Sequence, residues 1–197
     1  MRLDTGNLAG GFSAARARLV LACGLLLLCA APAAVAQSDA DAVTAKRRIE
    51  AAFLYKFSTY VDWPDGAFAT AEAPIVFGVE GDDLLADELT QTVSTRKVAQ
   101  RPLVVRKVKK GTLSPGVHVL FAADIDDDWL LAGAAQSQPT LVVTDRQGAL
   151  SHGSTINFVV VDEHVRFEIS LIDADRRDLK LSARLLEVAK NVVREKP

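Results

Sequence analysis

The first helical pattern of hydrophobic residues lies in residues 43–60. Apolar side chains recur there at steps of three and four, which is the spacing of an amphipathic helix. The helix is predicted to end at Asp62-Trp63-Pro64, because the residue before a proline is disfavoured in the helical region. The positions that form its apolar stripe are Val43, Ile49, Phe53, Phe57 and Tyr60.

Short apolar runs alternate with helix-favouring stretches between residues 75 and 144. Residues 75–79 (IVFGV) contain no charged position, which predicts a strand buried on both faces. Gly81-Asp82-Asp83 follows and can cap a helix over residues 84–93. Such alternation is typical of a parallel sheet with crossover helices. The other predicted elements are strands over 103–108, 117–121 and 140–144 and a helix near 127–136.

The C-terminal part has a different pattern. Residues 156–161 and 165–169 are separated by three polar residues, which predicts an antiparallel hairpin. Helices are expected near 171–177 and over 181–192, the second on a stripe of Leu181, Leu185, Val188 and Val192. We therefore predict one α/β domain with a mostly parallel central sheet of about five to six strands, flanking helices, and a C-terminal β-hairpin plus helices.

The first 36 residues have the pattern of an export signal. Two arginines precede an uncharged apolar run over residues 19–31, and Ala34-Val35-Ala36 is the small-x-small pattern that signal peptidase accepts. We predict cleavage after Ala36, a flexible lead-in over residues 37–45 and a folded domain over residues 46–193. A retained membrane anchor is the alternative, although the run is shorter than the roughly 20 residues that span a bilayer.

Cleavage at this position would change the chemistry available to the chain. Both cysteines, Cys23 and Cys29, lie in the leader, so the mature chain would have no disulfide, thiol nucleophile or cysteine metal site. The leader also holds three of the 23 basic residues and one of the 25 acidic residues, which leaves a net charge of −4. An acidic surface is repelled by phosphates, so no nucleic-acid partner is expected.

The acidic run ADIDDDW at residues 123–129 is the most conspicuous candidate for ion binding. Asp124, Asp126 and Asp128 alternate as in a calcium loop, but Trp129 stands where that loop requires glycine. We interpret these acids as residues at a helix N-terminus, where negative charge is favourable. A phosphoacceptor site of the receiver type is also disfavoured, because the strand over residues 156–161 ends without a lysine.

The histidines form no recognisable catalytic or metal-binding motif. His118, His152 and His164 lie on different predicted elements without metal-ligand spacing, and Ser151 beside His152 lacks a nucleophile elbow. We interpret His118 as a core or edge residue with satisfied hydrogen bonds. No catalytic residue, metal or cofactor is expected, and the protein is not predicted to be an enzyme.

Six sequence blocks follow one another along the chain: residues 51–64, 118–121, 140–145, 153–158, 165–170 and 179–186. Taken in order, they resemble the YfiR family of YfiR/HmsC-like regulators. The resemblance covers residues 46–190 and implies a periplasmic, non-catalytic protein that inhibits a membrane-bound diguanylate cyclase by binding its periplasmic sensor portion. It also implies a homodimer and an outer-membrane-associated protein that sequesters the inhibitor. Better-known members carry disulfides that the mature chain would lack, and Ser170 replaces the asparagine usual in the family.

Six residues are candidates for contact with a partner or ligand. Tyr55 lies off the apolar stripe and Trp63 and Phe68 lie beyond the helix end, and aromatic residues are enriched where partners dock. Packing inside the domain is the competing interpretation of these aromatics. The alternative function is a small-ligand sensor, with a pocket at the carboxyl ends of the parallel strands. The remaining candidates, which could equally be ordinary solvated residues, are Glu168, Arg176 and Arg184.

Overall fold

The computed structural model describes residues 31–109, 115–123 and 139–194, and the chain divides into two compact units, residues 1–44 and 45–197. In the first unit the described residues belong to helix α2 (Ala31–Ser58), which continues into the second unit. Residues 37–45 belong to this helix and include several alanines, the strongest helix former. The flexible lead-in expected there stays a prediction. Cleavage after Ala36 stays a prediction. No helix in the described ranges is long and apolar enough to cross a membrane.

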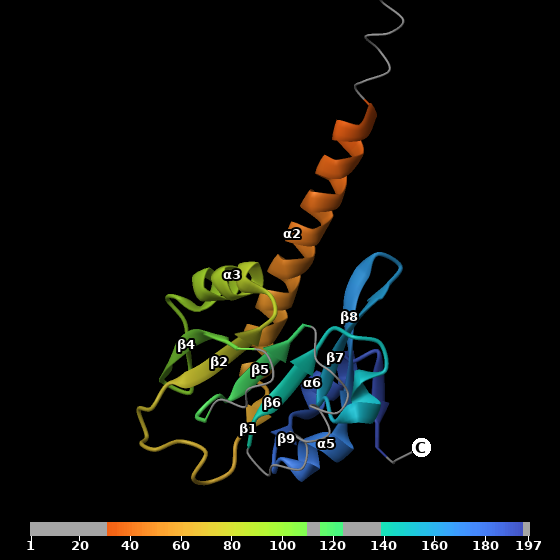
Figure 1. Ribbon diagram of the computed structural model, residues 1–197. Helices are drawn as coiled ribbons and strands as arrows, with labels where there is room; N and C mark the ends of the chain where they lie inside the picture. The colour runs from red at the N-terminus through yellow and green to blue at the C-terminus, as the bar shows by residue number, and fades with distance from the viewer. Residues whose placement is uncertain (1–30, 110–114, 124–138, 195–197) are drawn as a thin grey trace, which may run out of the picture. The chain divides into compact units, whose positions relative to one another are not determined.

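The second unit is an α/β domain built on a twisted sheet, whose strands lie side by side from β4 to β8 in Figure 1. After α2, its elements in chain order are β1 (Val61–Asp62), β2 (Ile75–Glu80), α3 (Asp83–Val93), β3 (Lys97–Val98), β4 (Arg101–Val108), β5 (Val119–Ala122), β6 (Leu141–Thr144), the 3-10 helix η1 (Ala149–His152), β7 (Ile156–Val161), β8 (His164–Ser170), α5 (Leu171–Arg176), β9 (Lys180–Leu181), α6 (Ala183–Val188) and β10 (Asn191–Val193).

The main sheet has the strand order β10-β8-β7-β6-β5-β2-β4-β3 within the described residues. Strands β4, β2, β5, β6 and β7 are mutually parallel, β10 is parallel to β8, and only the β3–β4 and β7–β8 pairs are antiparallel. The mostly parallel α/β sheet is thus confirmed. It has eight strands, more than predicted, because β3 and β10 are too short to give a recognisable pattern.

Chain order reverses between β2 and β5. The chain runs from β2 outward to β4, then returns to the other side of β2 and continues through β5, β6 and β7. This is the flavodoxin-like doubly wound order, in which ligands bind at the carboxyl ends of the two strands flanking the reversal. The switch point of this sheet therefore lies between the carboxyl ends of β2 and β5.

The local patterns of β2, α3 and the hairpin predicted these elements correctly. All six residues of β2 are buried, as expected for a strand covered on both faces. Asp82 caps α3, and β7 and β8 pair antiparallel around Asp162 and Glu163, which both have positive φ. Two consecutive positive φ values are what a type I′ hairpin turn requires.

Residues 181–192 do not form the single helix that the sequence predicted. Leu181 belongs to β9 and pairs with Val61 of β1, and α6 ends at Val188 before Ala189 takes extended angles. Val192 then pairs with Ile169 of β8. Leu181, Leu185 and Val192 contact the core from these three separate elements, whereas Val188 is exposed. The predicted helix near 127–136 lies outside the described residues.

The core forms where α2 packs against the sheet. Phe57 is fully buried, and its ring centroid lies 4.9 Å from that of Phe167 and 5.7 Å from that of Phe158. Phe53 lies 5.4 Å from Phe167. Aromatic pairs at such distances contribute about 0.5–1.5 kcal/mol beyond the area they bury. The prediction that Phe53 and Phe57 belong to the core side of the helix is confirmed, whereas Ile49 is exposed.

Candidate functional site

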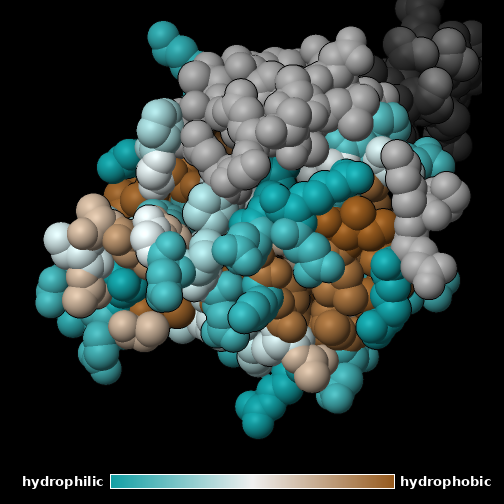
Figure 2. Space-filling model, turned by 90° about the horizontal axis from the view of Figure 1, so that it is seen from below, coloured by the Kyte–Doolittle hydropathy of each residue, from teal (hydrophilic) through white to brown (hydrophobic). Residues whose placement is uncertain are grey.

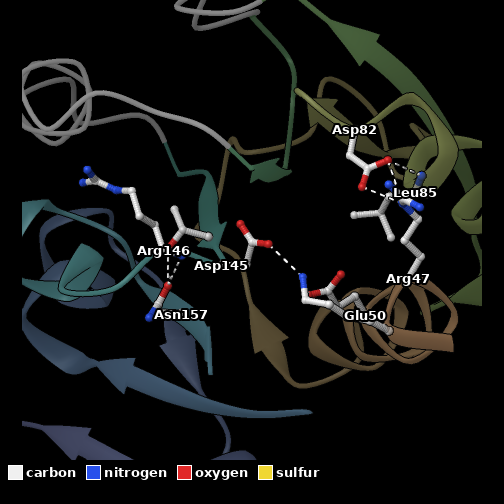
Figure 3. A network of polar contacts seen from close by, with 9 residues as sticks. Arg47, Glu50, Asp82, Leu85, Asp145, Arg146 and Asn157 are labelled. Carbon is white, nitrogen blue, oxygen red and sulfur yellow. Dashed lines mark hydrogen bonds and ion pairs between the residues drawn. The ribbon is translucent and has the colours of Figure 1, made fainter. Parts of the chain in front are cut away.

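The carboxyl edge of the sheet carries a network of charged side chains beside the strand reversal (Figure 3). Asp82 follows β2, and its carboxylate accepts from the backbone N–H of Leu85 at 2.9 Å. The same carboxylate accepts from Nε of Arg47 on α2, at 2.7 Å to Oδ2 and 3.0 Å to Oδ1. An acidic cap satisfies a free N–H of the helix start and interacts favourably with the helix dipole. Asp82 thus fixes the beginning of α3 and ties it to α2.

A second part of the network joins α2 to the segment after β6. The ammonium of Lys46 lies 2.7 Å from Oε1 of Glu50 and 2.8 Å from Oδ2 of Asp145. Burial raises the pKa of Glu50, which is only 1% exposed, although Lys46 acts in the opposite direction. Burial would lower the pKa of Lys46, but its hydrogen bonds to Asp145 and Glu50 outweigh that effect and raise it. Lys46 therefore only partly offsets the effect of burial on the Glu50 carboxylate.

A cavity of about 260 Å³ opens beside this group. Its charged wall consists of Lys46, Glu50 and Asp145, and its apolar wall includes Phe158 and Val165 of the β7–β8 hairpin. The described residues contain no group of three or more acids, histidines or cysteines placed to hold a metal. Asp124, Asp126 and Asp128, the acids that the sequence analysis considered for ion binding, lie outside the described residues.

The opposite, amino edge of the sheet carries an aromatic cluster. The rings of Trp63 and Phe68 lie 6.0 Å apart in an edge-to-face arrangement. Phe68 also stacks on His118, with ring centroids 4.4 Å apart, and the guanidinium of Arg101 lies 3.7 Å from the Phe68 centroid. Cation–π contact of this kind contributes about 0.5–1 kcal/mol at exposed sites.

The segment between β1 and β2, residues 63–74, is fastened to the sheet by two side chains, and we call it the aromatic loop. Nη1 of Arg101 donates to the carbonyls of Thr70 and Ala73, at 2.9 and 2.8 Å. His118 is 7% exposed, and its Nε2 lies 3.1 Å from the carbonyl oxygen of Ala67. These bonds hold the aromatic rings in place from the two sides of β2, because Arg101 begins β4 and His118 directly precedes β5.

The aromatic loop forms the wall of a hollow of about 810 Å³, which we call the aromatic hollow. An adjoining hollow of about 480 Å³ shares Asp62, Trp63 and Asp65 with it and adds Asp178 and Lys180. Figure 2, seen from the side of β1 and β9, shows hydrophobic surface exposed between hydrophilic side chains. Both hollows open to solvent, as does the cavity beside Lys46. Residues that line the aromatic hollow include Asp62, Trp63, Asp65, Phe68, Lys97 and Arg101.

The six candidate contact residues do not form one site. The structure brings Trp63 and Phe68 together in the aromatic hollow. Tyr55 is half-buried against the core, with the guanidinium of Arg96 4.5 Å from its ring centroid. The other three lie elsewhere. Glu168, on β8, is 3.7 Å from Lys190, and Arg176, on α5, donates to Asp173 at 3.0 Å. Arg184 is exposed on α6.

The sequence analysis missed the network on α2 and the role of Arg101. Lys46 and Glu50 are four residues apart on a helix, a spacing that brings their side chains together and could have indicated a pair. No local signal pointed to Asp145 as the distant partner of Lys46, or to Thr70 and Ala73 as the distant partners of Arg101. The interpretation of His118 as a satisfied residue is confirmed, because both of its ring nitrogens have partners.

Comparison with known protein families assigns the domain. The sequence profile of the YfiR/HmsC-like family matches residues 47–190, most of the chain. The chain belongs to the YfiR/HmsC-like family. This membership indicates a regulatory, non-catalytic protein of periplasmic cyclic di-GMP signalling that acts through protein partners. A search of curated proteins found no match to this YfiR/HmsC-like chain.

Proposed function

We propose that this protein binds the periplasmic sensor portion of a membrane-bound diguanylate cyclase and inhibits the enzyme, so that cellular cyclic di-GMP falls. The observation that carries the proposal is the family match over residues 47–190. The aromatic hollow supports it by offering a surface on which such a partner could dock. We further propose that the protein acts as a homodimer and is released by an outer-membrane-associated sequestering protein.

The physical character of the aromatic hollow fits a protein contact. Trp63 and Phe68 are half-buried, and side chains of this type supply most of the binding energy at interfaces. The hydrogen bonds from Arg101 and His118 fix the aromatic loop before a partner binds. Binding to a preformed surface avoids the entropy cost of ordering a loop, which makes more of the contact energy available for affinity.

Cellular cyclic di-GMP tests this function directly. Deleting the gene in a strain with an intact membrane cyclase should raise the nucleotide, measured by mass spectrometry, and a wild-type copy should restore it. A copy that carries both Trp63→Ala and Phe68→Ala should not restore it, whereas Arg184→Ala should. Unchanged cyclic di-GMP on deletion would contradict the proposal. Calorimetry with the purified sensor portion would show whether binding is direct.

A small-ligand sensor is the second candidate, favoured by the cavity of about 260 Å³ beside Lys46, Glu50 and Asp145. Its volume suits a small polar molecule with one apolar side, and it lies at the edge where open α/β sheets bind ligands. Thermal-shift screening against amino acids and cofactors tests it. A hit should vanish when Val165→Trp fills the apolar wall and persist in Arg184→Ala. An absence of any stabilising compound would leave protein binding as the function.

A further inference from the structure

His118 connects the aromatic loop to the sheet through both nitrogens of its ring. The backbone N–H of Val76, on β2, lies 3.1 Å from Nδ1. Nε2 lies 3.1 Å from the carbonyl oxygen of Ala67, in the aromatic loop. A backbone N–H only donates and a carbonyl only accepts, so Nδ1 must be unprotonated and Nε2 must carry the hydrogen. The observed arrangement is therefore possible only for the neutral imidazole.

The surroundings of His118 contain no acidic group that would stabilise its protonated form among the described residues. The β2 side presents the backbone of Val76, and the loop side presents the rings of Trp63 and Phe68. The neighbouring strand β4 presents Arg101, whose positive charge acts on the imidazole. Burial lowers the pKa of His118 below its ordinary value, and Arg101 adds to that effect, although the hydrogen bond to Ala67 opposes it.

We propose that His118 is an acid-sensitive latch, whose protonation at Nδ1 detaches the aromatic loop from the sheet and dismantles the aromatic hollow. A proton on Nδ1 would point at the N–H of Val76, so the acceptor is lost and two donors face each other. The imidazolium would also be buried close to Arg101. Release of residues 63–74 lets the charged ring reach water and removes both penalties.

The direction of the latch follows from the lowered pKa. The loop is closed at neutral pH, and it opens in acid once the pH falls below the ordinary histidine value of 6.5. Trp63 and Phe68 would then lose their fixed positions relative to Arg101. The consequence for partner binding rests on the proposed function, with tighter binding at neutral pH than in acid. The latch itself is a property of the isolated domain and can be tested without any partner.

Accessibility of Trp63 reports on the latch. The chain has two tryptophans, so Trp129→Phe leaves Trp63 as the only one. Acrylamide quenching should rise several-fold from about pH 7.5 to about pH 4.5, on either side of the ordinary histidine pKa of about 6.5. Quenching efficiency is preferred to intensity because a protonated imidazole itself dims a neighbouring indole. Adding His118→Asn, whose amide oxygen can accept from Val76 but cannot titrate, should abolish the rise.

A second measurement needs no substitution. Hydrogen exchange of the unmodified protein, followed by mass spectrometry and corrected for intrinsic rates, should show lost protection in residues 65–73 at the acid pH while residues 77–80 stay protected. The latch is overturned if protection of the loop is unchanged, if His118→Asn shows the same rise in quenching, or if far-UV circular dichroism collapses at the same pH. The last outcome would mean global unfolding in place of local release. None of these results depends on whether a cyclase binds.

Discussion

Arg47 and the backbone N–H of Leu85 donate to the same carboxylate, that of Asp82, at 2.7 and 2.9 Å. One side chain therefore satisfies the start of α3 and joins this helix to α2 across the carboxyl edge of the sheet (Figure 3). These two contacts of Asp82 link α2 to α3, two helices that are not joined by sheet hydrogen bonds. It also makes Asp82 the most consequential polar residue of this edge for stability.

Asp82→Ala is expected to destabilise the domain by about 1–3 kcal/mol, because it removes a helix cap and leaves Arg47 without its partner. Urea unfolding followed by circular dichroism measures the change. The matched control is Asp87→Ala, since Asp87 is an exposed acid of the same helix that contacts Lys107 at 3.0 Å. Exposed ion pairs contribute about 0–1 kcal/mol. Equal effects of the two substitutions would contradict the role of Asp82.

Glu50 should make the wild type lose stability as the pH rises. Burial raises the pKa of Glu50 in the folded protein, so near and above the ordinary carboxyl value of 4.5 the folded state binds more protons than the unfolded state. Stability then falls with rising pH through that region. Between about pH 4 and about pH 6, the unfolding free energy of wild type should fall relative to that of Glu50→Gln, whose amide does not titrate. A pH-independent difference in urea midpoints would show that Glu50 does not titrate as described.

His118 should have the opposite dependence. Its pKa is lowered by burial and by Arg101, so its contribution is fully present above the unfolded value of 6.5 and is lost as the pH falls. His118→Phe keeps a ring against Phe68 but leaves the Val76 N–H without an acceptor, at a cost of about 1–3 kcal/mol at neutral pH. The deficit should shrink in acid, as thermal unfolding at several pH values would show. A constant deficit would contradict the lowered pKa.

Gly78→Ala should destabilise the sheet although alanine is a small residue. A Cβ at this position of β2 would meet Val108 Cγ2 at 2.9 Å and Val117 Cγ1 at 3.0 Å. Overpacking of this kind typically costs about 1–3 kcal/mol. Urea denaturation provides the measurement. An unchanged unfolding midpoint would mean that the two valines move aside without cost.

Trp63→Ala should weaken binding to the sensor portion of the cyclase by about 2 kcal/mol, which corresponds to a roughly 30-fold higher Kd. The reason is loss of a half-buried aromatic side chain from the aromatic hollow. Isothermal titration calorimetry gives the Kd. Arg184→Ala, on exposed α6, is the control and should bind as wild type does. If both variants bind equally well, the docking surface lies elsewhere on the domain.

The patterns within single elements were sufficient for much of the fold. Three features depend only on residues that are close together in the chain, so the sequence reveals them directly. They are the uninterrupted apolar run of β2, the cap and helical spacing of α3, and the β7–β8 hairpin. The family was recognisable for the same reason, because its blocks are local. The last three elements, β9, α6 and β10, were misjudged because apolar residues of a helix and of short strands can share one spacing.

The amino-acid sequence by itself determined that β2 is buried on both faces, that α3 follows it and that β7 and β8 form a hairpin. It also determined the family to which the chain belongs. Only the tertiary structure decided which residues meet. Lys46 and Asp145 are 99 positions apart, and His118 is 51 positions from Ala67. Such pairs are determined by the strand order and by the point at which the chain reverses. The spacing of apolar residues within one element contains no information about them. Both the charged network and the aromatic hollow are consequences of that order.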